Sequence, residues 1–331
     1  MAYQQELDVA KRAVALASKL CEKVRNSLLT SKSKMAMTKI DRTPVTIADY
    51  GSQAIICKML RENFPNDPVV AEEDAGDLRL PGQKDQLQKI TAYVQEALIE
   101  GDIGSDSDAQ PEAVLRWIDF GNGDVTPNLR RFWTLDPVDG TKGFLRGDQY
   151  AICLALIEDG DVKVGVLSCP ALNLDGSVGH LFTAERGKGA FRQSLSEGSG
   201  GQSKKVNVSQ ESSCGIQSFE ASHGNHEAQQ HIAKVVGLDN MLRMDSQAKY
   251  AMVASGHACL YIRLSNYFEN IWDHAAGAII VQEAGGTVSD RNGKPLRFCV
   301  AKNMFENSGV VVSNGYIHDE VLAALQKGDN H

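Results

Sequence analysis

The chain has 331 residues, of which 42% are hydrophobic, so it can bury a substantial core and suggests two domains at ~100–200 residues each. Its 34 basic and 42 acidic residues give a net charge of −8, which argues against a general nucleic-acid or membrane-surface binder. No apolar run approaches the ~18–20 residues of a membrane span, and the N-terminus lacks the pattern of a secretory leader, so we expect a cytoplasmic protein.

The first predicted elements are two helices. Apolar residues recur at helical spacing from Leu7 to Leu28, and the polar stretch Thr30–Arg42 ends this amphipathic helix. A second helix is expected from about Ala48 to Asn63. Asp49 would then occupy its first turn, where the partial positive charge of a helix start favours a carboxylate.

A short buried strand is predicted next, at Pro68–Ala71, and it places Glu72 and Glu73 at its end. The interval from Asp74 to Asn128 holds one expected helix, around Gln86–Ile99, within Gly-, Asp- and Ser-rich sequence. We expect most of the remainder to be a mobile loop near the mouth of a site, with a plain surface insertion about equally favoured.

A second buried strand, Phe132–Leu135, leads into Asp136. The residues that follow it turn the chain, and Gly140 allows a backbone conformation that a residue with Cβ resists. Thr141 then falls where a helix or turn begins, and the unpaired N–H groups of such a start attract anions.

Two hairpins are predicted after this turn. Tyr150–Ile157 and Val162–Leu167 flank one turn, and Arg186–Gly189 forms the other. The Ser/Gly-rich stretch Ser194–Gln202 resembles a linker. We therefore divide the chain into an N-terminal α+β half, residues 1–205, and a C-terminal α/β half, residues 206–331.

Strand and helix patterns alternate in the C-terminal half. The expected elements are a strand at Gln217–Glu220, helices at Glu227–Val236, Ser246–Ser255 and Trp272–Ala284, and a strand at Ala258–Arg263. The seven cysteines show no metal-site spacing, and we expect buried thiols in a reducing compartment rather than disulfides or a redox switch.

Acidic residues gather at the ends of these apolar segments: Asp49, Glu72, Glu73, Asp136, Asp139 and Asp273. Any one of them alone would be a helix cap or turn residue. Together they need a cation to offset their repulsion, and oxygen-only ligands select Mg²⁺, Mn²⁺ or Ca²⁺. The sequence therefore predicts a site for several hard divalent cations.

The order of these motifs resembles a known family, the lithium-sensitive, Mg²⁺-dependent phosphatases that include inositol monophosphatase and fructose-1,6-bisphosphatase. Within it the match is closest to the 3′(2′),5′-bisphosphate nucleotidases, because of the Lys142–Gly147 extension and the segment Asp245–Tyr250. The matching segments are Thr43–Gln53, Ala71–Asp74, Asp136–Gly147 (DPVDGTKGFLRG), Asp245–Tyr250 and Ile271–Gly277.

The resemblance implies a layered α/β (α+β) sandwich of alternating helix and sheet layers, with the site between the halves. It implies two to three Mg²⁺ ions, held by Glu72, Asp136, the Val138 carbonyl, Asp139 and Asp273, and inhibition by Li⁺. Asp49 and Thr141 would form the proton-accepting pair of the mechanism. Glu73 is interpreted as a hydrogen-bond acceptor behind the ligands. Val138 stands where the family most often has Ile.

Substrate contacts carried over from the family are Thr141, His223, Ser246, Lys249, Arg263 and Asp273. They imply a phosphatase that converts adenosine 3′,5′-bisphosphate (PAP) to AMP and phosphate, and that acts on its sulfo form (PAPS) in sulfur metabolism. The alternatives are an inositol polyphosphate 1-phosphatase or an inositol monophosphatase and, from another class, a catalytically inactive nucleotide sensor. We expect a monomer or homodimer with no macromolecular partner.

Overall fold

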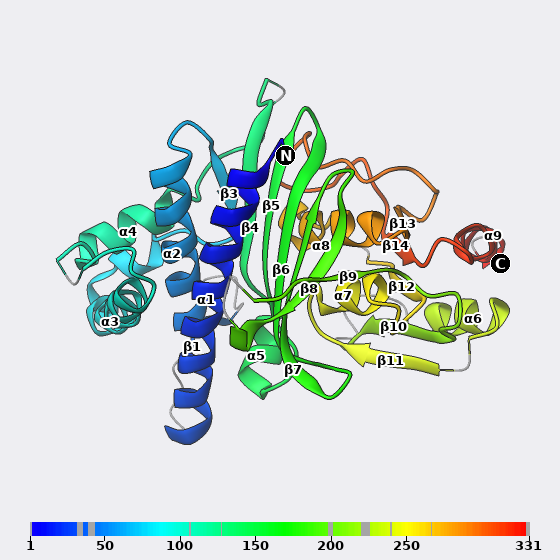
Figure 1. Cartoon of the computed structure of the whole chain (residues 1–331), viewed down its shortest axis with the longest axis horizontal. Helices are drawn as coiled ribbons and strands as arrows, with labels where there is room; N and C mark the ends of the chain where they lie inside the picture. Colours follow the sequence, from blue (N-terminus) through cyan, green and yellow to red (C-terminus); the bar gives the residue numbers. More distant parts are fainter. Residues whose placement is uncertain are drawn as a thin grey trace.

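A seven-stranded sheet forms the centre of the molecule, in the order β3-β4-β5-β6-β7-β8-β9 (Figure 1). The computed structural model describes residues 2–31, 36–38, 44–105, 107–126, 128–197, 201–219, 226–238, 240–265 and 267–328. β3 pairs with β4 in parallel, and the other neighbours pair antiparallel. The strands are Val69–Ala71 (β3), Arg131–Asp139 (β4), Ala151–Glu158 (β5), Asp161–Leu174 (β6), Ser177–Glu185 (β7), Gly189–Ser194 (β8) and Lys204–Val206 (β9).

Both predicted hairpins are confirmed, as β5–β6 and β7–β8. In the first, Asp159 and Gly160 have φ values of 53° and 83°. Two left-handed residues in succession are typical of a type I′ turn, whose twist matches that of antiparallel strands. The turn residues thus account for the tight connection between β5 and β6, whose register shifts once between Leu156 and Ile157.

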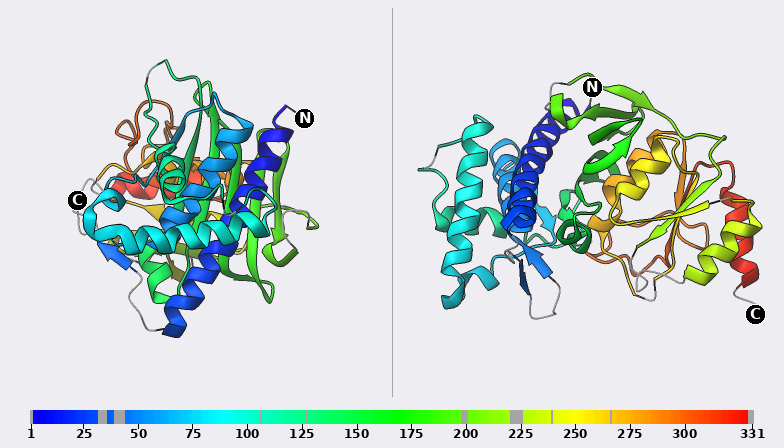
Figure 2. Two further views of the ribbon diagram at one scale, coloured as in Figure 1. Left: turned by 90° about the vertical axis from the view of Figure 1, so that its left-hand side faces the viewer. Right: turned by 90° about the horizontal axis from the view of Figure 1, so that it is seen from below.

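Helices α1 (Gln4–Ser31) and α2 (Ile47–Asn63) cover one face of this sheet, as Figure 2 shows from two sides. The buried stripe of α1 includes Val14, Leu20 and Val24, which pack in one core with α2 and with the near face of β4–β6. Both helices agree with the predicted ones. A two-stranded ribbon, β1 (Ala36–Thr38) and β2 (Pro44–Thr46), precedes α2.

The expectation of a loop is wrong for part of the interval before β4. Besides α3 (Lys84–Glu100), which matches the predicted helix, the structure has α4 (Pro111–Asp119) and two short 3₁₀ turns, Asp77–Arg79 and Pro81–Gln83. Val114, Leu115 and Ile118 are buried against α2 and α3. Nine residues contain too few helical repeats to separate α4 from its polar surroundings by periodicity.

The other face of the large sheet is covered by α7 (Ala248–Ala254) and α8 (Ala275–Glu283), which pack in turn against a second sheet. That sheet has five strands in the order β11-β10-β12-β14-β13 (Figure 1). Along the chain, the last strand of the large sheet ends at Val206, and the first strand of the five-stranded sheet begins at Cys214. Its strands are Cys214–Ser218 (β10), Asn240–Met244 (β11), Leu260–Arg263 (β12), Thr287–Ser289 (β13) and Val310–Ser313 (β14).

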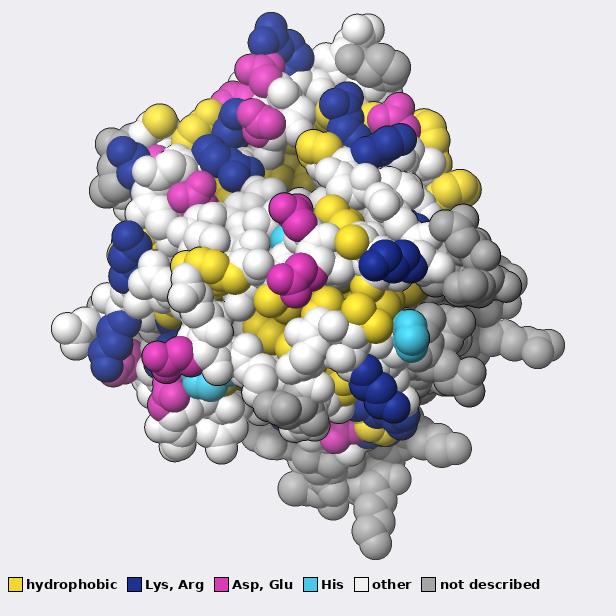
Figure 3. All heavy atoms as spheres, turned by 90° about the vertical axis from the view of Figure 1, so that its right-hand side faces the viewer, with side chains coloured by type: hydrophobic (Ala, Val, Ile, Leu, Met, Phe, Trp, Pro, Cys, Tyr) yellow, Lys and Arg dark blue, Asp and Glu magenta, His cyan; other side chains and the backbone are white. Residues whose placement is uncertain are grey.

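Helices α6 (His226–Val235) and α9 (His318–Gly328) cover the outer face of the second sheet. The chain is therefore built of alternating helix and sheet layers, from α1–α2 through to α6–α9 (Figure 1). The outer face shows Lys and Arg interspersed with Asp and Glu (Figure 3). Exposed hydrophobic side chains in this half of the chain include Val235 at the end of α6, Leu242 on β11 and Tyr316 just before α9.

Several predicted boundaries differ from the structure. β4 continues to Asp139 rather than ending at Leu135, and β10 lies at 214–218 rather than 217–220. The helices expected from Ser246 and Trp272 begin later, at Ala248 and Ala275. Ser246 has φ of 64°, which no helix accommodates, and a 3₁₀ turn, Ile271–Asp273, precedes α8. The sequence did not predict β11, β13, β14 and α9.

All seven cysteines lie within the described residues and none forms a disulfide. Five of them are buried, and burial raises the pKa of Cys21, Cys57, Cys153, Cys169 and Cys259. Among the residues that the structure describes, no helix is both long and apolar enough to cross a membrane.

His318, at the start of α9, makes stability depend on pH. Its Nδ1 and Nε2 lie 2.9 Å from the hydroxyls of Ser313 and Ser289, and burial lowers its pKa from 6.5. A lowered pKa contributes stability that is present above the unfolded value and lost as pH falls below it. We expect the contribution of His318 to the free energy of unfolding to decrease from pH about 7.5 to about 5.5. His318→Asn should reduce this slope in chemical denaturation, and an unchanged slope would contradict the assignment.

Candidate active site

The ends of α2, β3 and β4 converge where the sequence predicts the acidic site. A hydrogen bond of 3.0 Å from the Ser52 hydroxyl to the Pro137 carbonyl links α2 to β4. On β4, the three steps from Asp136 to Asp139 oppose only two steps on β5, from Cys153 to Ala151. This bulge inserts one extra residue, and bulges redirect side chains beside active sites.

Three carboxylates meet at this bulge. Single oxygens of Asp136, Asp139 and Asp273 all lie within 4.8 Å of one another. Asp136 and Asp139 come from the large sheet, whereas Asp273 comes from the 3₁₀ turn before α8. Asp273 Oδ2 accepts a hydrogen bond of 2.9 Å from the Asn270 backbone N–H. The structure thus brings the predicted residues together, although 134 positions of chain separate Asp139 from Asp273.

Burial raises the pKa of Asp136 far above its usual range, and the carboxylates of Glu72, Asp139, Asp273 and Asp49 raise it further. Burial also raises the pKa of Asp139, to about 6, and that of Asp273. Asp136 is buried, Asp139 and Asp273 are half-buried, and the three repel one another, so their charged forms are costly without a cation. An all-oxygen donor set of this kind suits a hard divalent cation.

Glu72 and Asp49 complete the acidic set. Asp49 is 1% exposed and lies in the first turn of α2, as predicted, and Glu72 follows β3 directly. Both act on the pKa of Asp136. Glu73 is buried, and its backbone N–H and carbonyl both bond the Gln53 side chain.

Thr141 begins the short helix α5 (Thr141–Arg146), as the sequence predicts. Gly140 precedes it with φ of 87°, the left-handed conformation expected there. The Thr141 hydroxyl donates to the Val138 carbonyl over 3.2 Å, and the Val138 N–H donates to Asp136 Oδ1 over 3.1 Å. Thr141, Val138 and Asp136 are thus held in one turn.

Two cations face the acidic cluster from α7 and β12. Lys249 is 3% exposed, and burial lowers its pKa to about 8 although Asp139 opposes the shift. Its Nζ lies 5.1 Å from the centre of the Tyr261 ring. The charge of Arg263 lowers the pKa of Asp139 and Asp273, which places it within electrostatic reach of both.

Ser246 and His223 were the remaining predicted contacts. Ser246 lies in the turn before α7, where its hydroxyl accepts a hydrogen bond of 3.2 Å from the Ala248 N–H. His223 lies outside the described residues.

The structure adds residues that sequence reasoning missed. Arg263 is paired with Glu269, with N–O distances of 2.8 and 2.7 Å, and bonds the Tyr267 hydroxyl over 2.8 Å. The buried Tyr250 hydroxyl lies 2.7 Å from Nδ1 of His274. Glu269 lies outside the segments that match the family motifs, so no motif pointed to it.

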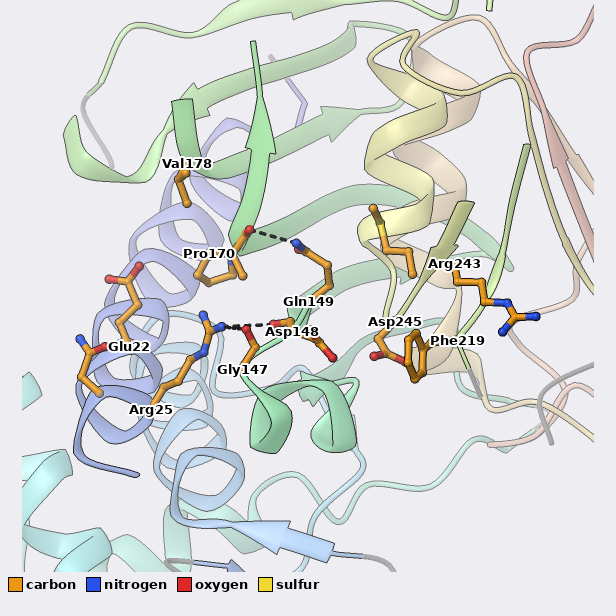
Figure 4. A pocket seen from close by; sticks show the side chains of 13 residues that line it. Glu22, Arg25, Gly147, Asp148, Gln149, Pro170, Val178, Phe219, Arg243 and Asp245 are labelled. Atoms are coloured by element: carbon orange, nitrogen blue, oxygen red, sulfur yellow. Dashed lines mark hydrogen bonds between the residues drawn. The ribbon is translucent and has the colours of Figure 1, made fainter. Parts of the chain in front are cut away.

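A cavity of about 650 Å³ lies beside this site but does not contain it (Figure 4). Its lining includes Arg25, Gln149, Phe219 and Asp245, and none of the five candidate acids at positions 49, 72, 136, 139 and 273. The carboxylate of Asp245 is paired with Arg146 of α5. Because the convergent carboxylates lie elsewhere, they define the candidate site rather than this cavity.

Comparison with known proteins identifies the family. The model of the inositol monophosphatase family matches residues 4–330. The chain belongs to the inositol monophosphatase family. It is 42% identical to 3′(2′),5′-bisphosphate nucleotidase 1 of Arabidopsis thaliana, covering 98% of this chain and 97% of that protein. It is 39% identical to 3′(2′),5′-bisphosphate nucleotidase of Emericella nidulans, covering 99% of each. The resemblance stated from the motifs is confirmed.

Solved structures support the fold. An inositol monophosphatase from Anabaena superposes with a TM-score of 0.64 at 21% identity, covering 99% of this chain and 97% of that one. A Thermotoga maritima IMPase gives a TM-score of 0.61 at 26% identity, covering 94% and 95%. The predicted layered α/β fold is therefore confirmed, and the family is one of metal-dependent phosphatases.

Proposed function

We propose that the chain is a Mg²⁺-dependent 3′(2′),5′-bisphosphate nucleotidase that hydrolyses PAP to AMP and phosphate. The convergence of Asp136, Asp139 and Asp273 beside the buried Lys249 carries the proposal. Clustered carboxylates bind divalent cations, and a neighbouring ammonium group attracts a second anionic group of the substrate. Support for the nucleotide comes from relatives of about 40% identity that carry this name.

The proposed ligands are Glu72, Asp136, the Val138 carbonyl, Asp139 and Asp273. When bound, Mg²⁺ would supply an activated water and neutralise charge on the transferred phosphoryl group. Thr141 would accept a proton from the attacking water and pass it toward Asp49. A hydroxyl alone is a weak base at neutral pH, so this role depends on the carboxylate of Asp49 as the final acceptor.

The substrate would be held by Thr141, Ser246, Lys249, Arg263 and Asp273, with His223 near the nucleotide end. Lys249 and Arg263 offer positive charge to the phosphate that remains on the 5′ position. Arg263 can present its outer N–H groups while Glu269 holds the guanidinium in place. Action on PAPS follows from the same contacts, because the sulfo group extends from the 5′ phosphate and leaves the 3′ phosphate unchanged.

Phosphate release tests the proposal. We would compare PAP, with AMP identified as product, against inositol 1-phosphate and inositol 1,4-bisphosphate, each with Mg²⁺ and with chelator. Metal-dependent release that favours PAP supports a nucleotidase. Release that favours an inositol phosphate would assign the chain to the alternative branch, and nucleotide binding without any release would favour a sensor.

Lithium inhibition is a further expected result. Li⁺ is a small oxygen-preferring ion with one positive charge, so it can occupy a weakly held Mg²⁺ position without matching its charge. At limiting Mg²⁺, millimolar LiCl should lower the initial rate of phosphate release, whereas KCl of equal ionic strength should not. A rate that falls equally with both salts would show only a general effect of ionic strength.

A further inference from the structure

Gln247 lies between the two segments that carry the candidate metal ligands, directly before α7. It is 2% exposed. Ser246 precedes it with φ of 64°, and the Ser246 hydroxyl accepts from the Ala248 N–H. The left-handed residue turns the chain so that the Gln247 backbone N–H donates to Asp139 Oδ2. Gln247 thereby contacts the first of the two segments through its backbone.

The side chain of Gln247 contacts the second segment. Its Nε2 donates to the Trp272 carbonyl over 2.8 Å, and its Oε1 accepts from the Gly277 N–H over 3.0 Å. Trp272 immediately precedes Asp273, and Gly277 lies in the first turn of α8, where backbone N–H groups have no partner within the helix. One amide group therefore bonds the backbone on both sides of Asp273.

Close packing of α7 on α8 makes this reach possible. A Cβ on Gly277 would come within 2.4 Å of the Tyr250 ring, so only glycine permits this approach of the two helices. The side chain of Gln247 is consequently enclosed, and its two hydrogen bonds have no water to replace them. Buried hydrogen bonds of this kind are costly to leave unmade.

We propose that Gln247 is a positioning residue for the metal site, which fixes Asp273 relative to Asp139. Oxygens of the two carboxylates lie within 4.8 Å of each other, and like charges at that separation repel. A rigid link between the two segments keeps the repelling oxygens in a cation-binding arrangement. This inference rests on the proposed metal-dependent function.

The test replaces the side chain and leaves the backbone N–H to Asp139 intact. Gln247→Met preserves volume and removes both side-chain hydrogen bonds. Gln247→Asn keeps an amide that is one methylene too short, and it serves if the first variant does not fold. The matched control is Gln193→Met, because Gln193 is 3% exposed and its Oε1 accepts a hydrogen bond from Ser203 on β8–β9, away from the site.

The readout is Mg²⁺ affinity of the folded protein without substrate, measured by calorimetry and by the Mg²⁺-induced rise in Tm. Loss of residues that orient metal ligands costs about 10–100-fold in affinity. We expect the Mg²⁺ affinity to fall by that factor in the folded Gln247 variant and to stay unchanged in Gln193→Met. The kcat of the Gln247 variant should recover in part at high Mg²⁺.

An unchanged Mg²⁺ affinity in the Gln247 variants would overturn the inference. So would an equal loss in Gln193→Met, because it would show a general effect of stability. Absence of Mg²⁺ binding to the wild-type protein would instead refute the proposed metal-dependent function, and the two failures are thereby distinguished.

Discussion

Asp136→Asn is expected to abolish phosphatase activity while making the metal-free protein more stable. Asp136 is 2% exposed. Burial is the largest cause of its raised pKa, and four other carboxylates raise that pKa further. Asparagine keeps the shape and removes one buried negative charge, so repulsion falls when no cation is present. With Mg²⁺ bound, the same change removes a ligand, and several kcal/mol of transition-state stabilisation corresponds to a rate loss on the order of 10³-fold or more.

Thermal denaturation with chelator and with saturating Mg²⁺ separates the two effects. The wild-type protein should gain stability from Mg²⁺, about 2.7 kcal/mol at a hundredfold excess over Kd. Asp136→Asn should raise the Tm in chelator and lose most of the Mg²⁺-induced rise. Asp161→Asn, on the exposed β5–β6 turn, is the control and should change neither value. A lower Tm of Asp136→Asn in chelator would contradict the repulsion argument.

The positions of the candidate metal ligands could be predicted from the sequence because these residues follow local features. Asp49 lies in the first turn of a helix, Glu72 follows a strand, and Asp136 and Asp139 lie on either side of the bulge at Pro137, directly before Gly140. Each of these positions is fixed by a strong helix, strand or turn pattern. Family motifs then linked the positions, and the distances among Asp136, Asp139 and Asp273 agree with that link.

The supporting residues could not be predicted in the same way. Gln247 acts through bonds to Trp272 and Gly277, which become its neighbours only when α7 packs on α8. Gln247 lies in the segment Asp245–Tyr250 that matches the family, but that segment alone does not show which groups its side chain bonds. The same reason explains α4 and β14, whose short apolar runs become recognisable only against the layers that bury them. Local patterns therefore predict the candidate ligands, whereas the residues that position those ligands are determined by tertiary packing.

The largest expected effect on stability comes from Arg263→Met. Arg263 and Glu269 have side-chain exposures of 12% and 4%, and they share two contacts, Nε–Oε1 of 2.8 Å and Nη2–Oε2 of 2.7 Å. Removing the guanidinium leaves a buried carboxylate without its main counter-charge, which costs about 3–5 kcal/mol. Arg263→Lys should rescue little, because one ammonium cannot reproduce the planar pair of donors.

The double variant Arg263→Met/Glu269→Leu should recover most of the lost stability, because replacing a buried ion pair by apolar residues is often close to neutral. Its activity on PAP should remain as low as that of Arg263→Met, since the positive charge offered to the substrate is still missing. Arg130→Met is the control, because the Arg130–Asp159 pair is exposed and should contribute less than about 1 kcal/mol. Urea denaturation of the wild-type protein, Arg263→Met, Glu269→Leu and the double variant gives the coupling energy. If the double variant is as unstable as Arg263→Met, then the uncompensated charge of Glu269 is not the cause, and Arg263 stabilises the fold through its packing and its bond to Tyr267 instead.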